Sequence, residues 1–377
     1  MTGKLRVGVI FGGRSAEHEV SLVSAASVIN ALDKSKYDVI PIGISAEGRW
    51  LSSPDAVRLL KEGGRLNDQH QMILLPDPAQ GGLVALGDSA GERERLPIDV
   101  IFPVLHGTFG EDGTVQGLFE LAGIPYVGAG VLGSSVGMDK VVTKQLCEHV
   151  KIPVTPYVWF TSESFKASPN KTISLIERMI KYPLFVKPAN LGSSVGISKV
   201  HKRSELGPAL ELAARYDRKI LVEKGIENAR EIEVSVLGND EPEASIPGEI
   251  VSSNEFYDYD AKYVDGRSTA VIPAKLPRSV TKKVMDLAVR AFKAVDCAGM
   301  ARVDFLVKKG SNRIYFNEIN TIPGFTSISM YPKLWEASGL PYPRLLDRLI
   351  ELALERHRAR QALSTTFKPK TDWYKGS

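Results

Sequence analysis

The chain has 377 residues, a formal net charge of +4 and two cysteines. This length suggests two or three domains, and two isolated cysteines exclude a disulfide framework and fit the reducing cytoplasm. The basic residues are scattered and no apolar run approaches the roughly 18 residues of a membrane span, so we expect neither nucleic-acid nor membrane binding.

The N-terminal third alternates between β-branched runs and segments with helical apolar spacing, which predicts a parallel sheet. Strands are expected at 5–11, 38–44 and 98–105, and helices at 19–32 and 114–122. Residues 53–97 lack clear periodicity and predict an insertion of short elements and loops. A glycine-rich break at 128–133 marks the end of this domain.

The rest of the chain predicts two mixed lobes. Helices are expected at about 139–149, 204–216, 279–295 and 343–360, strands at 184–187, 195–200, 220–223, 231–237 and 246–251, and a hairpin at 300–320. We predict a substrate domain at 1–128, a central lobe at 129–223, a C-terminal lobe at 224–360 and a solvated tail at 361–377. A loop rich in Tyr, Asp and Gly at 254–268 is expected to be a mobile lid.

The hairpin carries a pattern that is typical of a metal site. A turn centred midway between its strands places Asp304 opposite Glu318 and Arg302 opposite Asn320, and all four share one face. Opposed carboxylates repel each other unless a cation lies between them. Oxygen donors without His or Cys favour Mg²⁺ or Mn²⁺. The alternative is the solvent-facing side of an ordinary hairpin.

A second pattern suits phosphate binding. Lys187 ends a strand, and the run Gly192-Ser193-Ser194-Val195-Gly196 follows it. Glycines let backbone N–H groups approach phosphate oxygens, and the lysine supplies a positive charge. No Gly-Lys-Ser/Thr is present, so this is not a Walker loop; the alternative is a plain surface turn. Glu223 and Glu231 near strand ends suit adenine and ribose, or are simple edge charges.

Six motifs occur in one order along the chain. They are G-G-R-S-A-E-H-E-V-S at 12–21, L-H-G-T-F-G-E-D-G at 105–113, M-D-K at 138–140, G-S-S-V-G at 192–196, F-Y-D-Y-D-A-K-Y at 256–263 and N-E-I-N-T-I-P-G at 317–324. Together they resemble the D-alanine–D-alanine ligases of the ATP-grasp superfamily, over roughly residues 4–356. Given this resemblance, the alternatives of an ordinary hairpin face, a plain surface turn and simple edge charges become minor for these residues.

The resemblance implies a three-domain α/β ATP-grasp fold, with a Rossmann-like parallel-sheet N-terminal domain and two mixed α+β lobes gripping ATP. It implies ATP-dependent ligation of two D-alanine molecules through a D-alanyl phosphate, releasing ADP and phosphate, for peptidoglycan precursor synthesis. It also implies two Mg²⁺ or Mn²⁺ ions, a cytoplasmic location and a homodimer.

By the same resemblance, each site residue has an expected role. The ATP ligands would be Lys140, Lys187, Gly192, Ser194, Glu223, Lys224, Ile226 and Glu231, and the metal ligands Asp304, Glu318 and Asn320. Residues expected to bind substrate are His106, Lys262 and Ser329. Those expected to act in catalysis are Glu17, Ser193, Tyr263, Arg302 and Gly324.

Some of these roles are more specific. Glu17 would receive the ammonium of the first D-alanine, and Arg302 with the Gly324 N–H would stabilise the oxyanion. The proton acceptor for the attacking amine stays open between Ser193 and Tyr263, because an ordinary phenol is too weak a base.

Two rival functions stay open at this point. One is an ATP-grasp ligase for a different acid and amine, such as the D-alanyl-D-lactate ligases, in which phenylalanine takes the place of Tyr263. The other is an ATP-binding module without catalysis, against which the intact Lys187, Arg302 and metal face argue. The histidines outside the six motifs and both cysteines are interpreted as structural: His70, His149, His201, His357, Cys147 and Cys297.

Overall fold

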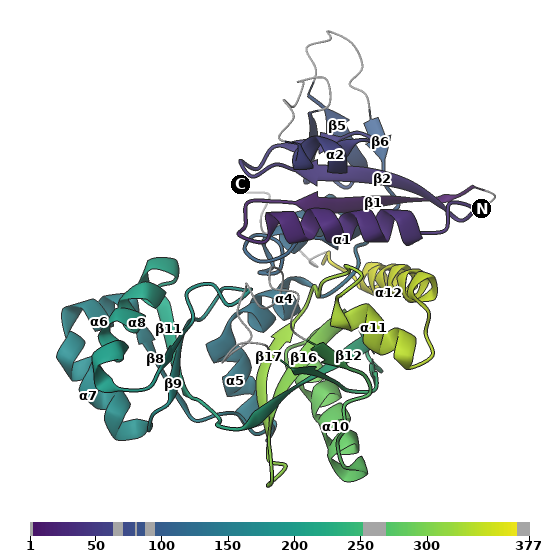
Figure 1. The fold of residues 1–377 in the computed structure, drawn as a ribbon. Helices are drawn as coiled ribbons and strands as arrows, with labels where there is room; N and C mark the ends of the chain where they lie inside the picture. Colours follow the sequence, from purple (N-terminus) through teal and green to yellow (C-terminus); the bar gives the residue numbers. More distant parts are fainter. Residues whose placement is uncertain (1–2, 63–70, 80, 87–94, 252–268, 368–377) are drawn as a thin grey trace.

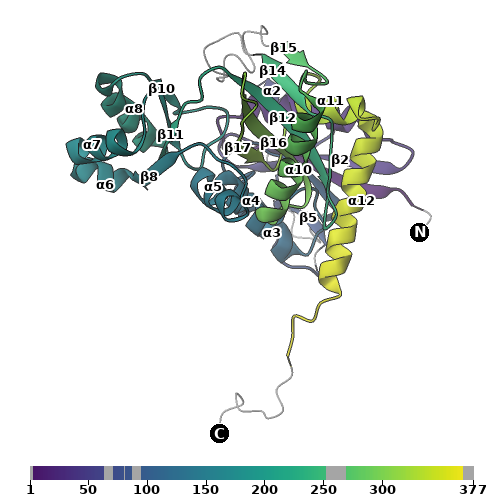
Figure 2. The same ribbon diagram turned by 90° about the horizontal axis from the view of Figure 1, so that it is seen from below.

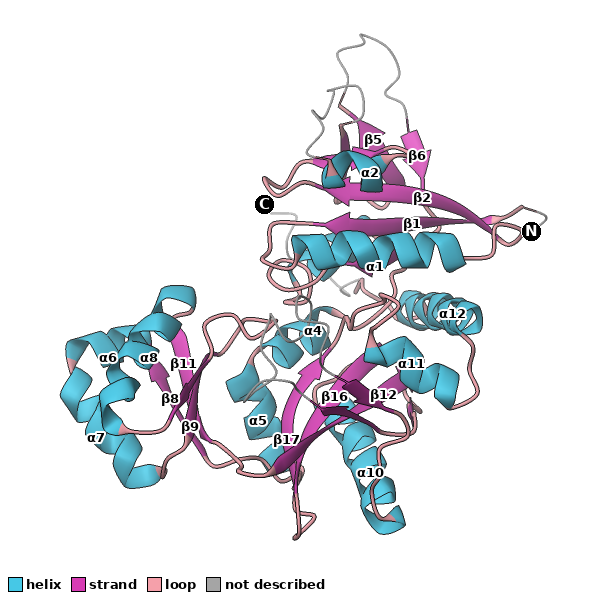
Figure 3. Cartoon of the chain, in the orientation of Figure 1, coloured by secondary structure: helices cyan, strands magenta, loops and turns pink. Residues whose placement is uncertain are grey.

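The computed structural model describes residues 3–62, 71–79, 81–86, 95–251 and 269–367 of the chain (Figure 1). Within these ranges the strands form sheets, and helices pack over them (Figure 3). No helix within these ranges is long and apolar enough to cross a membrane.

The N-terminal part folds around a parallel sheet, as the sequence predicts. Its elements are β1 (Leu5–Gly12), α1 (His18–Ala31), β2 (Tyr37–Ile44), β3 (Trp50–Ser52), β7 (Val100–Val104) and α3 (Thr114–Ala122). The strand order is β3-β2-β1-β7, with β3 as an antiparallel edge strand. Val9 belongs to the core under α1 and Ile10 to the core under α3, so β1 is buried on both faces. This burial explains its unbroken apolar run.

Residues 53–97 contain short elements, as expected for the insertion. Those described are α2 (Ala56–Lys61), β4 (Met72–Leu74), β5 (Gly82–Ala85) and β6 (Arg95–Pro97), with the strands in an antiparallel sheet. Met72, Leu74 and Leu83 join the same buried cluster as Ile10 and Phe119. The insertion therefore extends the core of the N-terminal sheet.

The central lobe is a four-stranded antiparallel sheet between helices. Its elements are α4 (Val131–Met138), α5 (Lys140–His149), β8 (Tyr157–Thr161), α6 (Ser162–Ala167), α7 (Pro169–Met179), β9 (Leu184–Pro188), β10 (Ser198–Val200), α8 (Arg203–Tyr216) and β11 (Lys219–Lys224). The strand order is β10-β9-β11-β8. Helices α6, α7 and α8 pack on one face, and Val141 of α5 packs on the other with Leu221.

Helix α4 was not expected from the sequence, and one expected strand has other bounds. Helix α4 begins at Val131, inside the glycine-rich run at 128–133. A Cβ on Gly133 would lie 2.5 Å from the carbonyl oxygen of Asp296, so this glycine allows close packing inside a helix. The strand expected at 195–200 starts only at Ser198, because the preceding residues form a tight loop.

The C-terminal lobe is an antiparallel sheet in the order β15-β14-β12-β16-β17, with β13 beside β12. The strands are β12 (Ala229–Gly238), β13 (Glu243–Ala244), β14 (Gly248–Val251), β15 (Thr269–Val271), β16 (Gly299–Lys308) and β17 (Ile314–Asn320), and the helices are α10 (Arg278–Ala294), α11 (Met330–Ala337) and α12 (Tyr342–Gln361). Helix α10 covers one face, where Phe292 joins Val234 and Phe305 in a buried cluster.

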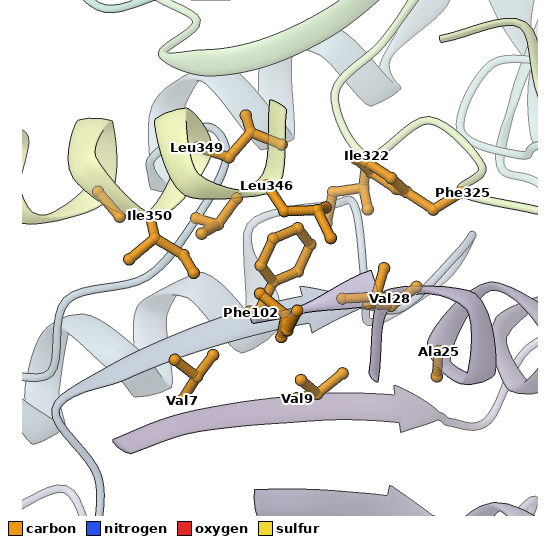
Figure 4. Packing of buried hydrophobic residues seen from close by; sticks show 14 of the residues in the cluster. Val7, Val9, Ala25, Val28, Phe102, Ile322, Phe325, Leu346, Leu349 and Ile350 are labelled. Carbon is orange, nitrogen blue, oxygen red and sulfur yellow. The ribbon is translucent and has the colours of Figure 1, made fainter. Parts of the chain in front are cut away.

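The last helix, α12, connects this lobe with the N-terminal sheet. It runs along the molecule beside the sheets of both parts (Figure 2). Its Leu346, Leu349 and Ile350 meet Val9 and Phe102 in one continuous core (Figure 4). The N-terminal sheet and the C-terminal lobe are therefore held together by buried apolar surface.

Phe325 anchors the loop between β17 and α11 in this shared core. It is fully buried and its ring meets Phe102 edge to face, with 5.7 Å between ring centroids. We expect Phe325→Ala to lower the free energy of unfolding by about 3–5 kcal/mol, because a large cavity remains. Urea denaturation measures this loss. Phe367→Ala is the control, since that ring is 86% exposed; equal effects of both changes would contradict the assigned packing.

Candidate active site between the two lobes and the N-terminal domain

Two adjoining cavities lie between the parts of the chain, the first where all three parts meet and the second between the central and C-terminal lobes. The first cavity is lined by Glu17, His106, Lys140, Gly192, Ser193, Arg302, Glu318, Asn320, Gly324 and Ser329, among others. The second cavity is lined by Lys140, Lys187, Gly192, Ser193, Ser194, Glu223, Lys224, Ile226, Glu231, Arg302, Asp304 and Glu318, among others. Every site residue expected from the sequence lies on one of these walls, apart from Lys262 and Tyr263. These two residues and the whole expected lid at 254–268 lie outside the described residues.

Glu17 precedes α1 and its carboxylate is buried between two glycines. The Ser193 hydroxyl donates a hydrogen bond to Glu17 Oε1, which links the N-terminal domain to the loop after β9. A Cβ on Gly107 or Gly192 would lie 2.6 or 2.7 Å from Glu17 Oε2. Both glycines are therefore needed for the carboxylate to reach this position.

The loop after β9 has a strained backbone at two successive residues. Ser193 and Ser194 have φ values of 46° and 60°, in the left-handed region that disfavours residues with a Cβ by about 1–2 kcal/mol each. Such strain persists where surrounding contacts fix the chain. One of these contacts is the Lys140 ammonium, which donates to the Leu191 carbonyl oxygen at 2.7 Å.

Lys140 is fixed by the start of helix α5. The Asp139 carboxylate caps this helix by accepting hydrogen bonds from the N–H groups of Val141 and Val142, and it pairs with Lys219 at 2.5 Å. The Lys140 ammonium also lies 3.8 Å from Glu318. It therefore stands at the wall between the two cavities.

Lys187 and Glu223 form a buried ion pair on neighbouring strands. Lys187 Nζ lies 2.5 Å from Glu223 Oε1 and 3.4 Å from Asn317 Oδ1. Desolvation opposes both charges, but Glu223 and Glu318 outweigh it and raise the pKa of Lys187, while Lys144 and Lys187 lower the pKa of Glu223. Both groups are charged at neutral pH. Glu223 thus serves two lysines, a role that its place at a strand end did not reveal.

The hairpin of β16 and β17 has the predicted register. Arg302 is opposite Asn320 and Asp304 is opposite Glu318, which confirms the expected pairing. The register then shifts by one residue, because Asn317 is extra on β17 and forms a bulge. This bulge brings Asn317 to the wall of the second cavity, near Lys187.

Three carboxylates follow one another across the sheet at this point. Glu233 on β12 is opposite Asp304, which is opposite Glu318. Arg302 compensates part of this charge, with Nε and Nη2 donating to Asp304 at 2.8 and 2.7 Å and Nε lying 3.2 Å from Glu233. Desolvation opposes the guanidinium charge, but Asp304 and Glu233 outweigh it and raise the pKa of Arg302.

The donor chemistry of this face fits a hard divalent cation. Asp304, Glu318 and Asn320 offer oxygen atoms only, and the Asn320 Oδ1 is oriented by the N–H of Ile322 at 3.1 Å. Among the described residues no group of three or more His, Cys, Asp or Glu side chains is arranged to hold a metal alone. Mg²⁺ commonly completes its shell with substrate phosphates and water, so two carboxylates and an amide suffice for it.

The loop after β17 closes the first cavity. A Cβ on Gly324 would lie 2.7 Å from the Ser329 hydroxyl oxygen, which accepts a hydrogen bond from the Thr326 N–H at 3.0 Å. His106 Nδ1 lies 3.0 Å from the Ile322 carbonyl oxygen, so this nitrogen carries the proton and donates. Burial lowers the pKa of His106, and the imidazole is therefore neutral.

Glu111 is a site residue that the sequence reasoning missed, although it lies in one of the six motifs. Its Oε2 accepts a hydrogen bond from the Gly107 N–H at 2.8 Å, and its buried Oε1 has no hydrogen-bond partner among the described residues. Burial, and then the nearby Glu17 charge, raises the pKa of Glu111 well above its ordinary value. Glu111 is thus a buried carboxyl with a raised pKa at the wall of the first cavity.

The raised pKa of Glu111 predicts a pH dependence of stability. Below its unfolded pKa the carboxyl is neutral in both states. Between the unfolded pKa and the raised folded pKa only the unfolded state is ionised, so stability falls as pH rises, by up to about 1.4 kcal/mol per pH unit. We expect Glu111→Gln to remove this decline, so its free energy of unfolding gains on the wild type between pH 5 and 8. Denaturant titrations across this range measure the gain. The exposed Glu163→Gln is the control, and parallel curves for Glu111→Gln and wild type would contradict the buried neutral carboxyl.

Two family models and several known proteins match almost the whole chain. The family model described as "D-ala D-ala ligase N-terminus" matches residues 6–129, and that described as "D-ala D-ala ligase C-terminus" matches residues 146–351. The chain is 52% identical over 364 residues to the D-alanine–D-alanine ligase of Natranaerobius thermophilus, covering 97% of this chain and 99% of that protein. It is 51% identical over 367 residues to that of Heliobacterium modesticaldum, with the same coverages.

Solved structures agree with this result. The D-alanine–D-alanine ligase of Coxiella burnetii has a TM-score of 0.80 and 41% identity, covering 95% of this chain and 97% of that one. The D-Ala:D-Ser ligase of Enterococcus faecalis has a TM-score of 0.82 and 38% identity, covering 93% and 100%. These likenesses confirm the ATP-grasp fold expected from the sequence. The chain belongs to the D-alanine–D-alanine ligase family.

Proposed function

We propose that the two cavities together form the site where this ligase joins two D-alanine molecules at the expense of ATP. The observation that carries the proposal is their common wall, to which Lys140, Ser193, Arg302 and Glu318 contribute. A nucleotide in the second cavity would point its terminal phosphate at this wall, and a D-alanine carboxylate in the first cavity would meet it there.

The second cavity suits ATP because its charges and its backbone complement a nucleotide. Lys140 and Lys187 supply positive charge near the loop of Gly192 and Ser194, where phosphates are expected. Lys224, Ile226 and Glu231 line the part of the cavity that we assign to adenosine. We assign Glu223 to holding Lys187, because both of its oxygens already contact ammonium groups.

Asp304, Glu318 and Asn320 are the proposed ligands of two Mg²⁺ or Mn²⁺ ions. Bound divalent cations would offset the charge of the transferring phosphoryl group, whose stabilisation is mainly electrostatic. Before they bind, Arg302 neutralises Asp304, as its two hydrogen bonds to that carboxylate indicate.

The first cavity suits the two amino acids. Glu17 is the proposed partner of the first D-alanine ammonium, and His106 lies where the carboxylate of that molecule is expected. Transfer of the γ-phosphoryl group to this carboxylate gives D-alanyl phosphate and ADP. The amine of the second D-alanine, whose carboxylate we assign to Ser329, then attacks the acyl carbon and phosphate leaves.

The oxyanion formed in this attack needs preorganised donors. Arg302 and the Gly324 N–H are the proposed donors, and both residues line the first cavity. The attacking amine must also lose a proton. The hydrogen bond from the Ser193 hydroxyl to Glu17 offers a path along which this proton can move. The proposed parts of Tyr263 in this transfer and of Lys262 at the γ-phosphate rest on the family resemblance. A homodimer in the cytoplasm is expected on the same ground.

The reaction predicts that D-alanine triggers phosphate release. With ATP and Mg²⁺ present, we expect inorganic phosphate to appear only when D-alanine is added, with one D-alanyl-D-alanine formed per phosphate. A coupled phosphate assay with chromatography of the product measures both. Preference for D-lactate as the second substrate at neutral pH would overturn the dipeptide assignment, and ATP binding without turnover would point to the non-catalytic module.

Arg302→Ala tests the proposed oxyanion donor. Loss of one preorganised donor typically costs about 3–4 kcal/mol of barrier, so we expect kcat to fall by a factor of roughly 10²–10³. The matched control is Arg313→Ala, because Arg313 is exposed in the turn region of the same hairpin. Near-normal turnover of a folded Arg302→Ala enzyme would refute this role.

A further inference from the structure

Helix α5 presents two lysines toward the second cavity, and only one of them reaches it. Lys140 and Lys144 are four residues apart, so they share a helix face. Lys140 lines both cavities, whereas the Lys144 side chain is 1% exposed and lines neither. A nucleotide in the second cavity would therefore meet Lys140 directly and would have no contact with Lys144.

Lys144 contacts the Glu223 carboxylate, which also holds Lys187, from the side that faces away from the cavity. Its Nζ lies 2.8 Å from Glu223 Oε2 and 3.2 Å from the Thr155 hydroxyl oxygen. The Thr155 hydroxyl donates to the same Glu223 oxygen at 2.9 Å. The other Glu223 oxygen contacts Lys187 at 2.5 Å. Glu223 is thus shared by a lysine at the cavity wall and a lysine behind it.

The charges of this buried group do not cancel. Two ammonium groups and one carboxylate leave a net charge of +1, on the side of the group that faces the cavity. Without Lys144, Glu223 would neutralise Lys187, and this pair would contribute no net charge to attract a polyanion. Glu318 adds further negative charge near Lys187, which increases the need for compensation. Charges removed from water interact strongly, so a single compensating ammonium matters here.

We infer that Lys144 is a positioning residue for nucleotide binding: by neutralising Glu223 from behind, it keeps the charge of Lys187 available to the phosphates of ATP. Glu223 then fixes the position of the Lys187 ammonium without neutralising its charge. This inference rests on the proposed use of the second cavity for ATP. It gives a reason for a fully buried lysine that takes no part in the mechanism above.

Two variants test this inference: Lys144→Met, and the double change of Lys144→Met with Glu223→Gln. Titration calorimetry gives the Kd of Mg-ATP without D-alanine, and steady-state kinetics gives the KM for each substrate. We expect Lys144→Met to weaken ATP binding about tenfold, which corresponds to about 1.4 kcal/mol, while the KM for D-alanine stays unchanged. The double variant restores the net charge of +1, so its Kd should return to within about threefold of the wild type.

A purely structural role for Lys144 gives a different result. In that case Lys144→Met lowers the melting temperature, and the added Glu223→Gln does not restore ATP affinity. Folded Lys144→Met protein that binds ATP like the wild type would also overturn the inference. If Lys144→Met alone does not fold, the double variant decides, because it removes the Glu223 charge together with the lysine that contacts it. Weak ATP binding by that folded protein counts against the proposal.

Two controls separate this test from the proposed function itself. Lys171→Met removes an exposed lysine from α7 of the same lobe and should leave the Kd of Mg-ATP unchanged. Wild-type protein that takes up no Mg-ATP at all would contradict the assignment of the second cavity. Normal wild-type binding with an unaltered Lys144→Met affinity would contradict only the role of Lys144.

Discussion

Charge compensation out of water is the constraint on which the site depends. Glu233, Asp304 and Glu318 lie side by side across three strands, an arrangement that repulsion disfavours. Arg302 makes it possible by bonding Asp304 with two N–H groups and approaching Glu233. Lys140 approaches Glu318 from the opposite lobe. The protein's own cations therefore hold these carboxylates together.

The same principle extends into the central lobe. Lys187 faces the second cavity, yet its charge is fixed by a carboxylate that would cancel it if the pair stood alone. The third member of the group, Lys144, sits behind Glu223 and is shielded from the cavity. Buried ion pairs are weak evidence for stability, because desolvation opposes their attraction. Their value here lies in placing charge at a defined point.

Close backbone approach is the second requirement of this architecture. Glu17 reaches the loop after β9 only because Gly107 and Gly192 leave room for its carboxylate. The loop that carries Gly324 is held by Phe325 in the core shared with α12. Parts of the chain that are far apart in sequence thus meet at fixed distances, as positioning for catalysis requires.

The sequence by itself determined the fold class, the parallel N-terminal sheet and the face shared by Arg302, Asp304, Glu318 and Asn320. The fold class follows from the resemblance of the six motifs to the family, and the parallel sheet from local periodicity. Side-chain alternation in a hairpin sets which residues share a face. Only the tertiary structure decided the partners of Glu223, the burial of Lys144 and the raised pKa of Glu111, because each depends on elements distant in the chain. The bulge at Asn317 lies between these two cases. The apolar residues Ile314, Phe316 and Ile319 break the spacing of two, and this break in the sequence signals the bulge. The contact of Asn317 with Lys187 was decided only by the packing of the two lobes.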